Sequence, residues 1–300
     1  MDGGAARTHG GDDPALPVPA WMLAVTAMFS VQLGAALSMP LISRVGSAGT
    51  AWLRLTAGAL IFLVIARPAL RSVQRRDIPA LIALGVTTGS MTCLFLASIE
   101  RIPLGTSVAI EFLGPLSVAA LRSGTRRALP WPAIALMGVL LLTEPWHGAV
   151  NLAGISLAAG SAVAWAIYIL LTQHIGDRLS GLTGLSLTIP IAAATAAVVG
   201  IPQAAGRITA TTVVAALGLA LLMPVLPFAL EMTALRHMNH AAFGTLMALE
   251  PAIGVVLGTL VLHQRPSLVQ TLGIVMVVVA GAAAQRNGRR QPAGAYLTPE

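Results

Sequence analysis

The sequence predicts an all-α integral membrane protein, with ten transmembrane helices arranged as two inverted-topology repeats of five helices. Three observations support this fold class. The chain is 56% hydrophobic and 10% charged, whereas soluble domains contain about 25% charged residues. Its apolar runs are long enough to cross a hydrocarbon core about 30 Å thick. A Pro-containing segment of the first half also aligns without gaps with one in the second half.

Apolar runs bounded by Pro, Gly or charged residues define the ten expected helices. They cover residues 20–38, 50–66, 78–98, 103–121 and 131–143, followed by 151–173, 182–199, 211–233, 240–262 and 267–284. The runs are unbroken, whereas strands of a membrane barrel would be about ten residues long and would alternate in polarity. The expected organisation is a polar cytoplasmic tail (1–19), two repeats (20–143 and 151–284) and a second cytoplasmic tail (285–300).

The arginines indicate the orientation of these helices, because the chain has 18 of them and no lysine. With the N-terminus in the cytoplasm, thirteen arginines lie on the cytoplasmic side, Arg54 lies within a predicted helix, and four lie outside: Arg44, Arg101, Arg207 and Arg265. This bias follows the positive-inside rule and predicts a cytoplasmic-membrane protein with both termini in the cytoplasm. The arginines are scattered over short loops, so the net charge of +7 does not indicate nucleic-acid binding.

The internal repeat has an offset of 136 residues, at which Leu113-Gly114-Pro115 aligns with Leu249-Glu250-Pro251. The identity is thin, and chance similarity between apolar helices is the alternative explanation. An odd number of helices in each half would make the second copy enter the membrane from the opposite side. That inverted repeat is typical of secondary transporters.

Two glutamates, Glu111 and Glu250, interrupt apolar segments close to the prolines of this repeat. Pro115 and Pro251 lack an N–H, so each is expected to break its helix near the middle of the membrane. A carboxyl group within a membrane helix is costly, which makes both glutamates candidates for binding substrate or protons. The alternative is a protonated carboxyl that joins two helices by a hydrogen bond.

Four further polar residues are candidates for the same cavity: Arg54, Gln32, Tyr168 and Thr245. Arg54 lies near a helix end, where it would either bind a carboxylate or extend to the interface. The neutral residues would either line the cavity or join helices. Glu231 is expected to pair with Arg236 and His237 at the interface. Small residues at four-residue spacing, Gly85 with Gly89 and Gly254 with Gly258, predict close helix crossings.

No pattern in the sequence indicates an enzyme, a cofactor or a metal site. Cys93 is the sole cysteine and is interpreted as a packing residue. Nucleophile–base sets, dinucleotide fingerprints and ATP-binding motifs are absent, so any transport must be secondary.

The segments "ERIPLGTSVAIEFLGPLSVA" (100–119) and "GTLMALEPAIG" (244–254) resemble the EamA-type family of the drug/metabolite transporter superfamily, and within it the threonine and homoserine exporter branch. The resemblance extends from about Trp21 to Ala284. It implies ten helices in two inverted repeats and export of small metabolites in exchange for protons, with Glu111 and Glu250 as the signature acids. The sequence departs from the family pattern at Asn239 and His240, where Pro and a small residue are expected.

The leading hypothesis is therefore a secondary exporter of amino acids or related small polar metabolites, with protons and membrane lipid as its other partners. One alternative is an exporter of bulkier drug-like or lipid-linked compounds. Few aromatic residues are available for cation–π binding, which argues against aromatic cations. A membrane enzyme or a subunit of a complex is the alternative from another class. The sequence has no cluster of nucleophile, base and metal ligands for an enzyme, and a subunit of a complex does not require acids within the membrane.

Overall fold

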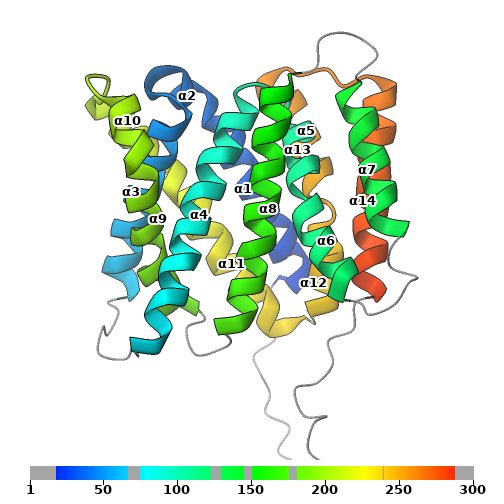
Figure 1. The fold of residues 1–300 in the computed structure, drawn as a ribbon, viewed down its shortest axis with the longest axis horizontal. Coiled ribbons are helices and arrows are strands. Elements are labelled where there is room, and N and C mark those ends of the chain that lie inside the picture. Colours follow the sequence, from blue (N-terminus) through cyan, green and yellow to red (C-terminus); the bar gives the residue numbers. More distant parts are fainter. Residues whose placement is uncertain are drawn as a thin grey trace, which may run out of the picture.

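The computed structural model describes residues 18–66, 75–122, 130–144, 151–175, 181–238 and 240–287. Within these residues the chain is helical and contains no strand, and its helices lie side by side in one bundle (Figure 1). The first described helix begins, and the last one ends, at the lower edge of the bundle as drawn. Most of both predicted tails, together with Asn239, lies outside the described residues.

The helix bounds follow the predicted apolar runs closely. The first half contains α1 (Ala20–Leu37), α2 (Met39–Val45), α3 (Ser47–Ala66), a short 3-10 turn η2 (Arg75–Asp77), α4 (Ile78–Ile99), α5 (Leu104–Glu111), α6 (Leu113–Arg122) and α7 (Pro130–Thr143). The second half contains α8 (Leu152–Ile175), α9 (Gly181–Ala204), α10 (Ala210–Ala220), a π-helical turn η5 (Leu221–Val225), α11 (Leu226–His237), α12 (His240–Met247), α13 (Glu250–Leu262) and α14 (Leu268–Asn287).

In the described part of the chain, eight helical segments are long and apolar enough to cross a membrane. The helices Pro130–Thr143 and Leu268–Ala284 are apolar but shorter. Large apolar side chains are exposed on the outer surface of the bundle, among them Val64, Val163 and Leu260. Because such a surface is stable only in lipid, the chain is a multi-pass integral membrane protein. The count of ten spans stays a prediction.

Three of the predicted helices are interrupted. The segment predicted at 103–121 forms α5 and α6, and the one at 240–262 forms α12 and α13. At both interruptions the backbone stays in the right-handed helical region, with φ −64° and ψ −17° at Phe112 and φ −78° and ψ −13° at Leu249. The helical hydrogen-bond pattern is interrupted at both positions, and the two helices on either side continue in the same direction.

The third interruption, at η5 between α10 and α11, was not predicted. Met223 has an extended backbone, with φ −161° and ψ 114°, and is followed by Pro224. Proline removes a helical hydrogen bond and clashes with the preceding turn, which accounts for the break. The hydroxyl of Ser30 on α1 donates a hydrogen bond of 2.8 Å to the carbonyl of Leu222. A neighbouring helix thus satisfies a carbonyl at the break, as the membrane interior requires.

Small residues bring the helices close together. The most extensive contacts are α3 with α9, α7 with α14, α4 with α8 and α9, and α1 with α11. Gly85 and Gly89 of α4 lie against Ile191 and the Ala192 carbonyl of α9, which confirms the predicted close crossing. Gly138 of α7 and Gly273 of α14 each approach the other's carbonyl oxygen, so a Cβ on either would be 2.6 or 2.5 Å from it.

Candidate functional site

Glu111 is the last residue of α5 and lies in the interior of the bundle, with 9% of its surface exposed. The hydroxyl of Ser161, on α8, donates a hydrogen bond of 2.5 Å to Glu111 Oε1. The same hydroxyl lies 3.2 Å from the carbonyl oxygen of Met91, on α4. A hydroxyl carries one hydrogen and two acceptor lone pairs. Ser161 is therefore able to donate to an ionised Glu111, or to accept from a protonated Glu111 while donating to Met91.

Arg54 lies on α3 and is only 2% exposed, so it does not extend to the interface. Its Nη1 atom is buried without a hydrogen-bond partner. The guanidinium interacts electrostatically with Glu111, and the two residues form no direct ion pair. An unpartnered guanidinium nitrogen in the membrane interior is costly, and an incoming anion would remove that cost.

Glu250 begins α13 and is 6% exposed. It interacts electrostatically with Glu111 and with Glu231 of α11. Glu111 thus interacts electrostatically with both Arg54 and Glu250.

The interfacial pairing expected for Glu231 is not found with His237. The imidazole Nδ1 of His237 lies 2.9 Å from the carbonyl of Thr233, one turn back on the same helix. Glu231 instead interacts with Glu250 and Tyr168. The physical reason is its position on α11, where it faces the bundle and not the interface. The side chain of Arg236 lies outside the described part.

The remaining predicted residues differ in burial. Gln32 on α1 is 2% exposed, and its Oε1 atom has no partner. Tyr168 on α8 and Thr245 on α12 are half-buried.

Ser107 was not predicted as a site residue. It is fully buried with an unpartnered hydroxyl one turn before Glu111. The four-residue spacing from Glu111 was the available signal, because such residues share a helix face.

Pro115 and Pro251 are both buried and lie in the first turns of α6 and α13. A first-turn N–H has no partner within its helix, so proline is tolerated there. The preceding helices α5 and α12 end at Glu111 and Met247, each four residues before one of these prolines. The acid and the interruption therefore occur at the same depth in α5.

The described residues contain no group of three or more His, Cys, Asp or Glu side chains that would hold a metal ion. What the site offers is a buried guanidinium, three carboxyls and neutral hydrogen-bonding atoms. These groups suit a ligand that carries both charges, with its anionic end at Arg54 and its cationic end at the acids.

The chain is similar to known transporters. The profile of the EamA-like transporter family matches residues 152–283. Threonine/homoserine exporter RhtA of Salmonella typhimurium (strain SL1344) is 34% identical over 282 residues, covering 92% of this chain and 95% of that protein. The protein of the same name from Escherichia coli (strain K12) is 34% identical over 281 residues, covering 91% and 95%. One solved crystal structure has the same fold, with a TM-score of 0.61 at 18% identity over 88% of this chain and 95% of that one.

Proposed function

The chain belongs to the EamA-like transporter family, and on that premise we propose that it exports small amino acids of the threonine and homoserine type in exchange for protons. Similarity to the threonine/homoserine exporters extends over 92% of the chain and supports this substrate class. The observation that carries the site assignment is the buried, unpartnered Nη1 of Arg54, whose guanidinium interacts electrostatically with Glu111 without a direct ion pair.

An amino acid in its zwitterionic form fits this arrangement. Its carboxylate would accept hydrogen bonds from Arg54, whose planar guanidinium suits bidentate recognition of carboxylates. Its ammonium would bind the carboxyls of Glu111 and Glu250. The hydroxyl group of threonine or homoserine would find an acceptor in Gln32 Oε1 or a partner in Ser107, which are both buried and unpartnered. Tyr168 and Thr245, which are half-buried, would line the same path.

Exchange for protons follows from the charge of the acids. Glu250 interacts electrostatically, as a like charge, with Glu111 and with Glu231, so ionising these acids together without a nearby cation is unfavourable. A substrate ammonium or protons would supply the missing positive charge. Protons that enter from outside would displace the ammonium and release the substrate. Inward proton flow would then drive outward movement of the amino acid, without ATP.

Alternating access through two inverted five-helix repeats is supported by the helix contacts. If α1, α3, α4, α5–α6 and α7 correspond to α8, α9, α10–α11, α12–α13 and α14, the pairs α3–α9 and α7–α14 each map onto themselves. The pair α4–α8 maps onto α11–α1, which is also a principal contact. Glu111 and Met247, the last residues of α5 and α12, are related by the 136-residue offset of the repeat. Interrupted helices at the repeat interface are where secondary transporters bind their substrates.

The direct test is counterflow in liposomes that contain the purified protein. Liposomes loaded with unlabelled threonine should accumulate labelled threonine and homoserine, and an inward proton gradient should stimulate efflux. Arg101→Gln removes an exposed arginine that pairs with Glu100 and should transport like the wild type. It is the matched control for removing the charge of Arg54. If the well-folded protein gives no counterflow with any amino acid of a broad panel, the assignment as an amino-acid exporter fails. Drug-like or lipid-linked compounds then become the leading substrate class.

A further inference from the structure

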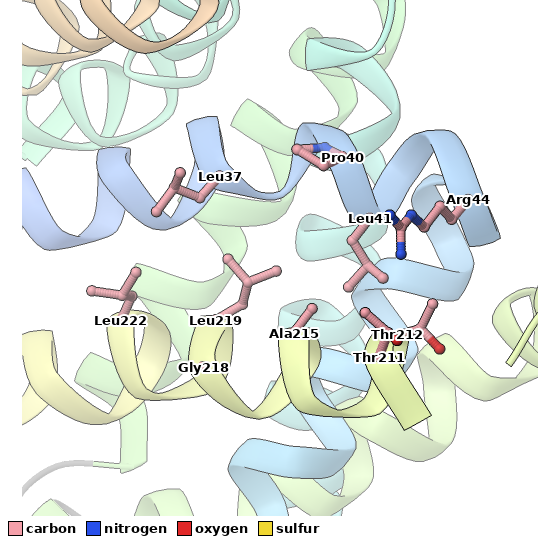
Figure 2. A pocket seen from close by; sticks show the side chains of 10 residues that line it. All are labelled: Leu37, Pro40, Leu41, Arg44, Thr211, Thr212, Ala215, Gly218, Leu219 and Leu222. Atoms are coloured by element: carbon pink, nitrogen blue, oxygen red, sulfur yellow. The ribbon is translucent and has the colours of Figure 1, made fainter. Parts of the chain in front are cut away.

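A cavity of about 420 Å³ lies between α1–α2 on one side and α10 on the other (Figure 2). None of the acids discussed above, nor Arg54, lines it. Its walls are apolar along most of their length and include Leu37, Leu41, Leu219 and Leu222. Arg44 and Thr211 lie at one end, and Leu222 lies at the other (Figure 2). The cavity is thus amphipathic along its length.

The position of this cavity relative to the membrane follows from the span that forms one wall. α1 and α2 together make the candidate span Ala20–Val45, and Arg44 is its penultimate residue. Arg44 is exposed and therefore lies near the level of the lipid headgroups, whereas Leu37 and Leu41 lie deeper. The adjacent surface of α10 exposes large apolar side chains, such as Val214 and Leu217. The apolar part of the cavity therefore lies at the level of the hydrocarbon, and its Arg44 end lies at the level of the headgroups.

We propose that this cavity binds one anionic membrane phospholipid, with its phosphate at Arg44 and an acyl chain between the leucines of α1–α2 and α10. Arg44 makes no ion pair among the described residues, so its charge is available to a ligand. A guanidinium recognises phosphate by charge-assisted hydrogen bonds, and basic pockets between membrane helices bind anionic headgroups. The hydroxyl of Thr211 lies at the same end and adds a donor for a phosphate oxygen.

A lipid in this position would contact the interruption between α10 and α11. Leu222 lines the cavity and belongs to η5, and its carbonyl accepts the hydrogen bond from Ser30 of α1. The acyl chain would therefore fill the space beside a helix break that α1 already supports. The occupant is a structural ligand of this break and is independent of which substrate the transporter carries.

Two substitutions separate the headgroup contact from the acyl-chain contact. Arg44→Gln removes the charge at an exposed position, where folding is not at risk. Gly218→Leu fills the cavity, because a Cβ on Gly218 would have no atom within 4 Å and leucine favours a helix more than glycine does. Arg207→Gln is the matched control, because Arg207 is an exposed arginine beside the start of α10 that does not line the cavity.

Native mass spectrometry of the purified full chain measures the outcome, with phosphatidylglycerol or phosphatidylcholine added after delipidation. The wild type and Arg207→Gln should retain one phosphatidylglycerol in preference to phosphatidylcholine. Arg44→Gln should weaken that retention about tenfold, the usual effect of losing a charge-assisted hydrogen bond, and Gly218→Leu should abolish it for both lipids. The proposal is overturned if the two arginine variants behave alike, or if Gly218→Leu retains lipid. It is equally overturned if Gly218→Leu changes only the proportion of dimers, which would indicate a second copy as the occupant.

Discussion

Ser161 and Glu111 are joined by a hydrogen bond that links α8 to α5 within the bundle. Ser161 is fully buried and lies beside the Met91 carbonyl of α4 as well. Three helices from both halves of the chain therefore meet at one hydroxyl group. Because a hydroxyl is both donor and acceptor, this contact persists whether or not Glu111 carries a proton. The interior acid is held in place in either state.

Replacing Ser161 should impair exchange more than it impairs folding. In Ser161→Ala the carboxylate of Glu111 loses a charge-assisted hydrogen bond, which is typically worth about 1.5–3 kcal/mol. Counterflow of threonine should fall by about one to two orders of magnitude, because Glu111 is no longer positioned for exchange. The protein should still fold in good yield, with a lower melting temperature because the same bond is lost from the folded state. Ser156→Ala on the same helix is the control, because the Ser156 hydroxyl donates to Ala153 at an exposed site. Equal effects of both substitutions would contradict a specific role for Ser161.

Arg54 should show opposite effects on stability and on transport. Arg54→Met removes a buried guanidinium whose Nη1 lacks a partner, and replacing such a group with an apolar side chain of similar size is often neutral or stabilising. We expect an unchanged or higher melting temperature in detergent together with loss of counterflow. A clear drop in melting temperature would instead identify Arg54 as a structural residue.

Gly46 should tolerate no side chain, because it has φ +81° and a Cβ would collide with the side chain of Gln203. Gln203 is held in place by accepting a hydrogen bond of 2.9 Å from the N–H of Gly49. Gly46→Ala should therefore destabilise the protein by about 1–3 kcal/mol, the usual cost of a backbone region, here φ 81° and ψ 166°, that is populated almost only by glycine. Gly218→Ala, at an unobstructed helical site, should keep or raise the melting temperature. The two melting temperatures in detergent decide this prediction, and similar values would refute it.

Features that depend on local sequence were predicted well, whereas features that depend on tertiary contacts were not. The length and apolarity of each run determine the helix positions, so α8 and α9 begin within one residue of the predicted starts at 151 and 182. Glu111 and Glu250 were recognisable because charge is rare in such runs. Ser161 gave no comparable signal, because its role depends on how α8 is rotated against α5. Pro224 was visible in the sequence, but the strong hydropathy around it concealed the break at η5.

Topology mapping would test the orientation that the arginine distribution predicts. Reporter fusions after Arg126 and after Arg290, both outside the described residues, should each report the cytoplasm. A fusion after Arg207, between α9 and α10, should report the opposite side. A periplasmic signal from the fusion after Arg126 or after Arg290 would exclude the scheme of five helices in each repeat. A cytoplasmic signal after Arg207 would place an even number of spans before α10.

Glu111 provides the decisive test of the proposed exchange. Glu111→Gln preserves the size of the side chain and its ability to hydrogen-bond to Ser161, at a cost to folding of about 1 kcal/mol. The variant should therefore fold, yet counterflow should fall by about one to two orders of magnitude because glutamine carries neither a charge for the ammonium nor a proton for exchange. Glu250→Gln should reduce counterflow similarly. The double variant should transport no worse than the worse single variant, since the effects of residues that act as a unit are not additive.

If Glu111 served only to join helices, Glu111→Gln would leave counterflow nearly unchanged and Glu111→Leu would reduce chiefly the yield of folded protein. Full proton-driven exchange by well-folded Glu111→Gln would thus remove the acid from the mechanism.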